Sequence, residues 1–184
     1  KENSIGAIYI VRDPRNVITS ISHHYQLTIN DALQFMMDEK KGIYVKKNDR
    51  YVAFQPLLSW SLNQKSWLEN NMFPVLMIKY EDLVSETFIT FKNILNFVYK
   101  ISNSKVLLNR RKIINSIKNC EFRNLSKLEK EKGFVEAAYN KNTNERIKFF
   151  NLGQKNQWTK ILDNKIVKEI EIKFGKEMKK LNYL

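Results

Sequence analysis

The sequence has few of the residues that build covalent or metal-linked frameworks. Its 184 residues include one cysteine, Cys120, and two histidines, His23 and His24. A single cysteine excludes an internal disulfide framework and a cysteine-cluster zinc site. Two adjacent histidines exclude a helical metal motif, in which the two histidines lie one turn apart. Because Cys120 has no second cysteine to pair with, we expect a thiol that is buried or lines a cleft rather than a redox centre.

Long apolar runs and targeting segments are also lacking. No stretch approaches the roughly 20 consecutive apolar residues of a membrane span, and no signal-peptide pattern opens the chain. We therefore expect a protein without a membrane span, located in the cytoplasm. The chain begins with Lys1, and apolar strand-like sequence begins by Ile5, which predicts a fragment cut from a larger domain. No repeat or low-complexity linker interrupts residues 1–184, which predicts a single domain.

The composition that is present supports a folded protein with a basic surface. Hydrophobic residues make up 43% of the chain and aromatic residues 12%, which is enough to build a core. Thirty-two basic residues against nineteen acidic ones give a net charge of +13. The basic runs are short and spread along the chain, so a solvated lysine-rich surface is favoured over a nucleic-acid stripe. The same positive field would favour phosphorylated small molecules.

Two apolar runs predict buried strands, and several helical patterns separate them. Residues 5–11 (IGAIYIV) and 73–80 (FPVLMIKY) are short and rich in β-branched residues, as in strands buried on both faces. Helical spacing covers residues 14–25, 32–39, 55–70, 84–98, 104–118, 122–130 and 163–181. Residues 42–51 are polar and irregular and predict a mobile loop, and residues 133–145 predict another loop.

Strands separated by long helical segments predict an α/β fold in which helices flank a parallel sheet. Ligands of such sheets bind beyond the carboxyl ends of the strands. Arg12 and Tyr80 stand at the ends of the two predicted strands. Arg12 is also followed by a predicted helix start, where backbone N–H groups favour an anion, and Ser20 could add a hydroxyl donor. The alternative is structural, with Arg12 paired to a carboxylate and Tyr80 capping its strand.

Several segments, taken in order, resemble the sulfotransferase family, which uses 3′-phosphoadenosine 5′-phosphosulfate. The first motif is fairly specific, and the resemblance covers nearly the whole chain. It rests on residues 8–17 (IYIVRDPRNV) with Ser20, 77–83 (MIKYEDL), 120–122 (CEF), 149–158 (FFNLGQKNQW) and 174–178 (FGKEM). The resemblance implies a P-loop NTPase-like sulfotransferase fold that is truncated at its N-terminus, because the family's phosphosulfate loop and its catalytic histidine precede the strand at residues 5–11.

The resemblance also implies roles for individual residues. Arg12 and Ser20 would hold the 3′-phosphate of the sulfuryl donor. Tyr80 and Phe122 would contact the adenine, and Cys120 stands where the family has a small polar residue. A small-molecule or glycan acceptor with a hydroxyl or amine would be sulfated. The resemblance implies no metal and no nucleic-acid partner, and it places no catalytic residue within this chain.

The late motif departs from the family pattern. Asn151 and Leu152 stand where the family has Arg and Lys, next to Gly153, whose backbone would close over the nucleotide. Asn156 replaces a second glycine. Loss of a charged contact weakens binding about tenfold or more. The residues that could compensate are Arg146, Lys148 and Lys155.

Two other classes of function stay open at the level of sequence. A nucleotide kinase-like phosphate-binding enzyme could also place arginine at a strand end, and an upstream Walker-type loop would favour it. A basic nucleic-acid-binding module would show steeply salt-dependent binding that is independent of Arg12. The acceptor cannot be deduced, although residues 28–72 are the segment in which we expect its specificity.

Overall fold

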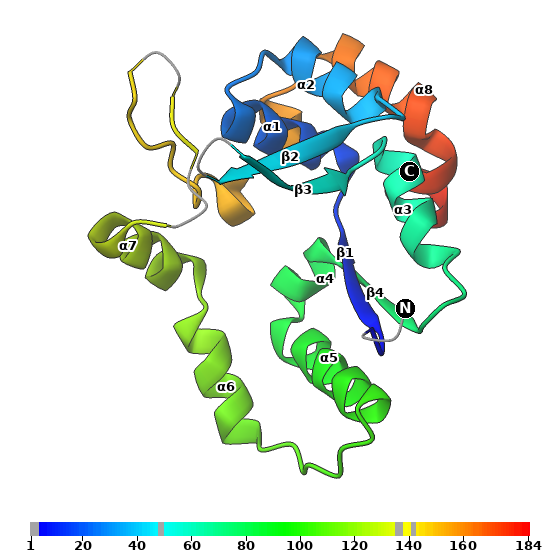
Figure 1. Cartoon of the computed structure of the whole chain (residues 1–184), viewed down its shortest axis with the longest axis vertical. Helices are drawn as coiled ribbons and strands as arrows, with labels where there is room; N and C mark the ends of the chain where they lie inside the picture. The colour runs from blue at the N-terminus through cyan, green and yellow to red at the C-terminus, as the bar shows by residue number, and fades with distance from the viewer. Residues whose placement is uncertain (1–3, 48–49, 135–137, 141–142) are drawn as a thin grey trace. The chain divides into compact units, whose positions relative to one another are not determined.

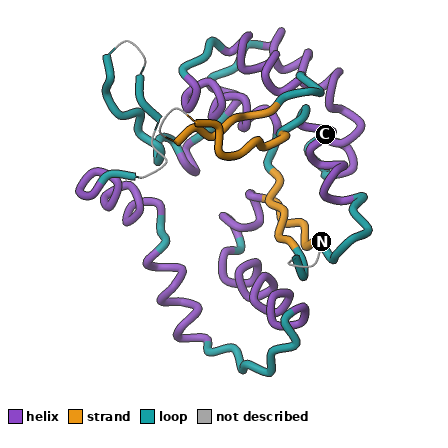
Figure 2. Tube along the Cα trace, in the orientation of Figure 1, coloured by secondary structure: helices purple, strands orange, loops and turns teal. Residues whose placement is uncertain are grey.

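The computed structural model describes residues 4–47, 50–134, 138–140 and 143–184 (Figure 1). Its contacts divide the chain into two compact units. The first consists of Lys1–Arg12 and Asn70–Asn156, and the second of Asp13–Glu69 and Gln157–Leu184. Figure 2 shows that helices dominate the chain and that the strands are short. That the two units form one domain over residues 1–184 stays a prediction.

A parallel pair of strands forms the sheet of the first unit. Strand β1 (Ala7–Val11) lies beside β4 (Val75–Lys79), and the last residues of the two strands, Val11 and Lys79, are partners in the register (Figure 1). Both apolar runs therefore form strands, and the predicted parallel pairing is confirmed. The carboxyl ends of the two strands meet at one edge, which brings together the residues that follow them.

The burial of β1 differs from the prediction. Val11 is buried, but Ile8 and Ile10 on the same strand are 40% and 50% exposed. Alternate side chains of a strand point to opposite faces, so one face of β1 is exposed. The prediction that both faces are buried is wrong for the chain as described, because no element among the described residues covers the face that carries Ile8 and Ile10.

Helices follow β4 in the first unit. Their bounds are α4 (Tyr80–Ser85), α5 (Thr87–Ile101), α6 (Arg110–Asn119), α7 (Phe122–Lys132) and the 3₁₀ turn η1 (Gly153–Lys155). The helix predicted from residue 104 begins only at Arg110, because the side chain of Asn109 caps it. The Asn109 Oδ1 accepts a hydrogen bond of 3.0 Å from the backbone N–H of Lys112, which is a typical N-cap bond.

Helices also dominate the second unit. They are α1 (Pro14–Tyr25), α2 (Ile29–Met37), α3 (Trp60–Leu68), α8 (Asn164–Lys180) and the 3₁₀ turn η2 (Trp158–Lys160). Residues from α1, α2 and α8 form a shared apolar core around Phe174, which is fully buried. Trp60 of α3 packs against this core, with its ring 5.4 Å from that of Phe174. The helices predicted at 14–25 and 163–181 are confirmed almost to the residue.

A hairpin replaces the loop predicted at residues 42–51. Strands β2 (Gly42–Lys47) and β3 (Arg50–Pro56) pair in antiparallel register, while residues 48–49 of the predicted loop lie outside the described residues. Across the hairpin, the rings of Tyr44 and Phe54 lie 4.9 Å apart. Both rings are more than half exposed. The strand sequences GIYVKK and RYVAFQP also lack the clear alternation of apolar and polar residues that marks a half-buried strand.

The helix predicted from residue 55 is correspondingly shorter. Residues up to Pro56 belong to β3, and α3 begins at Trp60. Ser59 caps α3, since its hydroxyl accepts a hydrogen bond from the backbone N–H of Leu62. None of the helices among the described residues is long and apolar enough to span a membrane.

Candidate anion and nucleotide site

Arg12 and Tyr80 meet where β1 and β4 end. Each is the first residue after its strand, and the register places Val11 beside Lys79. The central carbon of the Arg12 guanidinium lies 4.1 Å from the centroid of the Tyr80 ring. Such a contact between a cation and an aromatic face is favourable, and it fixes the plane of the guanidinium. The N–H donors of Arg12 then point outward within that plane.

Most of the donor capacity of Arg12 is unused. Its Nη2 donates one long hydrogen bond, 3.4 Å, to the carbonyl oxygen of Gly153. Its Nε is buried and has no hydrogen-bond partner. Among the described residues, no carboxylate forms an ion pair with this side chain. A buried donor without a partner is costly, so Arg12 is suited to receive an anionic ligand.

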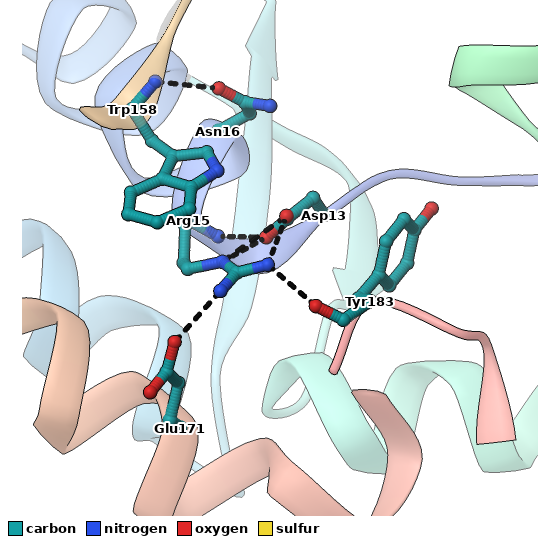
Figure 3. A network of polar contacts seen from close by, with 6 residues as sticks. All are labelled: Asp13, Arg15, Asn16, Trp158, Glu171 and Tyr183. Atoms are coloured by element: carbon teal, nitrogen blue, oxygen red, sulfur yellow. Dashed lines mark hydrogen bonds and ion pairs between the residues drawn. The ribbon is translucent and has the colours of Figure 1, made fainter. Parts of the chain in front are cut away.

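Arg15, three residues further on, has the opposite character (Figure 3). Its guanidinium donates to the Asp13 carboxylate at 2.7 Å, to Glu171 of α8 at 2.7 Å and to the carbonyl oxygen of Tyr183 at 2.7 Å. The Trp158 ring covers it at 4.2 Å. Burial disfavours its charge, but the hydrogen bonds and charges of Asp13 and Glu171 outweigh burial and raise the pKa of Arg15 above its ordinary value.

The alternative considered for Arg12, an arginine with a structural role that is paired to a carboxylate, therefore describes Arg15. The carboxylate of Asp13 also accepts from the backbone N–H of Arg15 at 2.9 Å and so caps α1. Asp13 is thus committed to the helix start and to Arg15. Of the two arginines in the motif, Arg15 has a structural role and Arg12 retains a charge without an ion pair among the described residues.

Gly153 and Phe122 lie in direct contact near Arg12. The backbone of Gly153 has a φ of +54°, which glycine adopts readily. A Cβ atom at this position would lie 2.5 Å from the Phe122 ring. Gly153 is therefore required both by its backbone conformation and by the close approach of the aromatic ring. The contact places a backbone carbonyl that binds Arg12 beside an aromatic ring that could stack on a base.

Comparison with known proteins identifies the family to which the chain belongs. The family model for the sulfotransferase domain matches residues 1–182. The chain belongs to the sulfotransferase family. Among solved structures, it is similar to mouse sulfotransferase SULT7A1 complexed with PAP, with 22% sequence identity and a TM-score of 0.60. That likeness shows the sulfotransferase fold, and no curated protein matches the chain.

The extent of these matches bears on the predicted truncation. The solved sulfotransferase is matched over 57% of its own length and over 93% of this chain. The family match, however, extends over almost the whole of this chain. It therefore does not confirm that the chain is only the later part of a sulfotransferase domain, and the absence of the phosphosulfate loop and of the catalytic histidine stays a prediction.

The remaining residues predicted from the sulfotransferase resemblance are exposed. Cys120 is an exposed thiol at the end of α6. Of the two predicted placements, a buried thiol is therefore wrong, because the helix ends at this residue and leaves its side chain in solvent, and a thiol that lines a cleft stays a prediction. Asn151 and Leu152 are also exposed and precede Gly153 in the turn. Their contribution to the nucleotide site stays a prediction.

Ser20 and the two histidines belong to the second unit of this sulfotransferase chain. The Ser20 side chain is exposed on α1, so it does not point into the core, and its hydroxyl donates to the Asn16 carbonyl at 3.4 Å. Arg12 belongs to the first unit, and the sharing of one anion by Arg12 and Ser20 stays a prediction. His23 and His24 are half-buried at the end of α1, and the His24 ring contacts Tyr25 at 4.7 Å.

The three basic residues that could replace the sulfotransferase Arg-Lys pair differ in their surroundings. Arg146 donates to the Tyr139 hydroxyl at 3.0 Å and lies against Gly133, so it is engaged elsewhere. Lys148 and Lys155 are exposed, and Lys155 closes the turn that begins at Gly153. Among the described residues, no group of three or more His, Cys, Asp or Glu side chains could hold a metal ion.

The network around Arg15 includes residues that the sequence did not single out. The Asn16 side chain accepts a hydrogen bond of 3.1 Å from the backbone N–H of Trp158, and Glu171 and Tyr183 bind Arg15 (Figure 3). These contacts join residues more than 140 positions apart. The sequence signals for Asn16 and Trp158 were the two segments of the resemblance that contain them, residues 8–17 and 149–158, and no signal pointed to Glu171 or Tyr183.

Proposed function

We propose that the protein serves the transfer of a sulfuryl group from 3′-phosphoadenosine 5′-phosphosulfate to a hydroxyl or amine acceptor. In this proposal the described residues supply the 3′-phosphate and adenine side of the donor site. The observation that carries it is Arg12, which stacks on Tyr80 and keeps a buried Nε without a partner. The membership of the chain in the sulfotransferase family supports the reaction class.

Arg12 would bind the 3′-phosphate. A guanidinium presents N–H donors in one plane, in a geometry that matches the oxygens of a phosphate. Tyr80 holds this plane, and the Gly153 carbonyl engages one Nη group. We propose that Ser20 adds a hydroxyl donor to the same phosphate, as the resemblance implies. Charge-assisted bonds of this kind are roughly twice as strong as neutral ones.

Phe122 would contact the adenine together with Tyr80. The Phe122 ring is half-buried at the first turn of α7 and lies against Gly153. Aromatic rings stack on bases with a gain of about 1–3 kcal/mol for each base. Asn151 and Leu152 would contribute the backbone of the turn rather than charged contacts. Cys120, exposed at the end of α6, would stand at the rim of this site.

The bound donor supplies the sulfuryl group, and this chain supplies binding and orientation. Orientation alone can contribute several kcal/mol to lowering a barrier, because it removes translational and rotational freedom before reaction. We assign no catalytic residue within the chain. His23 and His24 are proposed to line the acceptor site or to face solvent, and the acceptor itself would be a small molecule or a glycan bound by residues 28–72.

Transfer of labelled sulfate tests this proposal. The assay uses the proposed full-length parent and a panel of phenols, alcohols, sugars and amines, with the 184-residue chain beside it. We expect transfer by the parent, at least tenfold less transfer by its Arg12→Ala variant at low donor concentration, and none by the chain alone. Transfer that is unaffected by Arg12→Ala would contradict the proposal, and salt-dependent nucleic-acid binding that is independent of Arg12 would favour the binding-module alternative.

A further inference from the structure

Glu129, on helix α7, binds the backbone of the turn that contains Gly153. Its Oε1 accepts a hydrogen bond of 2.6 Å from the backbone N–H of Phe149, and its Oε2 accepts one of 3.0 Å from that of Phe150. Bonds from backbone N–H groups to a carboxylate are charge-assisted and strong. No ion pair among the described residues involves Glu129, so its two oxygens serve the backbone of the turn.

The Phe122 ring makes a second contact between the same turn and the same face of α7. Phe122 lies seven residues before Glu129, and residues at this spacing lie on one face of a helix, two turns apart. The Phe122 ring contacts Gly153 and lies 6.0 Å from the ring of Phe150. Helix α7 therefore holds the turn at Glu129 through hydrogen bonds and at Phe122 through an aromatic ring.

This arrangement matters because the turn contributes backbone and not charge to the proposed site. Asn151 and Leu152 are uncharged, whereas the Gly153 carbonyl accepts a hydrogen bond from Arg12. A site built from backbone depends on where the backbone is held. The Glu129 carboxylate binds the backbone of the turn two residues before Asn151.

We infer that Glu129 is a positioning residue for the adenine side of the nucleotide site, a role that rests on the proposed function. It would hold Gly153 against Phe122, so that the aromatic ring and the turn already have the conformation that binds the base. Preorganisation of this kind raises affinity because less freedom is lost on binding. The contact of Arg12 with Tyr80 does not involve the turn, so we expect the phosphate contact to depend on Glu129 less than the base contact does.

The experiment compares two ligands on three forms of the chain. Calorimetry measures the affinity of the wild type, Glu129→Gln and Glu131→Gln for adenosine 3′,5′-bisphosphate and for base-free ribose 3,5-bisphosphate. Glu131 is the matched control, because it lies on the same helix and its side chain forms, among the described residues, only an exposed pair of 3.8 Å with Lys127. We expect Glu129→Gln to reduce the preference for the nucleotide over the base-free ligand about tenfold, and Glu131→Gln to leave it unchanged.

Each outcome has a distinct meaning. An unchanged preference in folded Glu129→Gln overturns the positioning role while leaving the proposed function intact. A wild-type chain that binds neither ligand overturns the proposed function, and the inference with it. If Glu129→Gln does not fold, amide hydrogen exchange of the wild type decides: we expect slow exchange at Phe149 and Phe150 that the nucleotide slows further. Fast exchange at both, unaffected by nucleotide, overturns the inference.

Discussion

The carboxylate of Asp13 is bound to Arg15 at 2.7 Å, and not to its chain neighbour Arg12. This pairing separates two arginines that the sequence places three residues apart. Arg15 is buried and forms ion pairs with two carboxylates. Arg12 stacks on an aromatic ring and keeps an unused buried donor. The two residues should therefore respond differently to substitution, one in stability and the other in ligand binding.

Arg15→Ala should destabilise the protein. Removing one partner of a buried ion pair typically costs about 3–5 kcal/mol, because the remaining charges are left uncompensated. Here Asp13 and Glu171 would both lose their ion pair with the guanidinium. Chemical denaturation measures the free energy of unfolding. The matched control is Lys173→Ala, which removes an exposed pair with Glu39 at 3.6 Å and should cost at most about 1 kcal/mol. Equal effects of the two variants would contradict this account.

Gly153→Ala should disturb the turn beside Phe122. The new Cβ would meet the ring at 2.5 Å, and the φ of +54° disfavours any other residue. We expect a loss of about 1–3 kcal/mol in the free energy of unfolding, together with weaker nucleotide binding. Gly175→Ala is the control, since its Cβ would meet only Leu184 at 3.8 Å inside a helix and should stabilise by up to about 1 kcal/mol. A Gly153→Ala variant with full stability would contradict the close contact.

Ionisation of the Tyr9 phenol should lower the stability of the protein at alkaline pH. Burial raises the pKa of Tyr9 from 10.0 to about 12, so the folded state holds the phenol proton more tightly than the unfolded chain does. This contribution is complete below pH 10 and is lost as the pH rises from about 10 towards 12. We expect the loss to reach at most about 2 kcal/mol.

Denaturation between pH 9 and about 12 measures this effect, with Tyr9→Phe as the comparison. The Tyr9→Phe variant should lose less stability over the same range, because it has no phenol to ionise at this position. Tyr25 has a pKa that burial also raises, so a smaller dependence on pH remains in that variant. A wild type and variant with the same pH profile would contradict the burial of the Tyr9 hydroxyl.

Local signals predicted the strands and the best helices. The apolar runs identified β1 and β4, and helical spacing over residues 14–25 identified α1, in which Pro14 occupies the first turn as is typical of proline. The parallel pairing followed from the long helical segments between the strands. The meeting of Arg12 and Tyr80 then followed from the pairing of strand ends.

Other features depend on contacts that single segments do not reveal. The hairpin of β2 and β3 is stabilised by Tyr44 and Phe54 across the strands, and neither ring belongs to the buried core. The start of α6 could have been found from the capping residue Asn109. The roles of Arg15 and Glu129 depend on partners far along the chain, Glu171 and Phe149, which composition and periodicity do not pair.

The affinity of the 184-residue chain for adenosine 3′,5′-bisphosphate tests the central claim most directly, when it is compared with adenosine 5′-phosphate by calorimetry. The account predicts that the wild type prefers the 3′-phosphorylated nucleotide and that Arg12→Ala removes this preference, weakening binding by about 10–100-fold. Arg110→Ala is the control, because it removes an exposed arginine that also lies over a ring, Phe88, at 5.2 Å; it should leave the preference unchanged. Equal affinity of the wild type for the two nucleotides, or a preference that survives Arg12→Ala, would contradict the claim that Arg12 binds the 3′-phosphate.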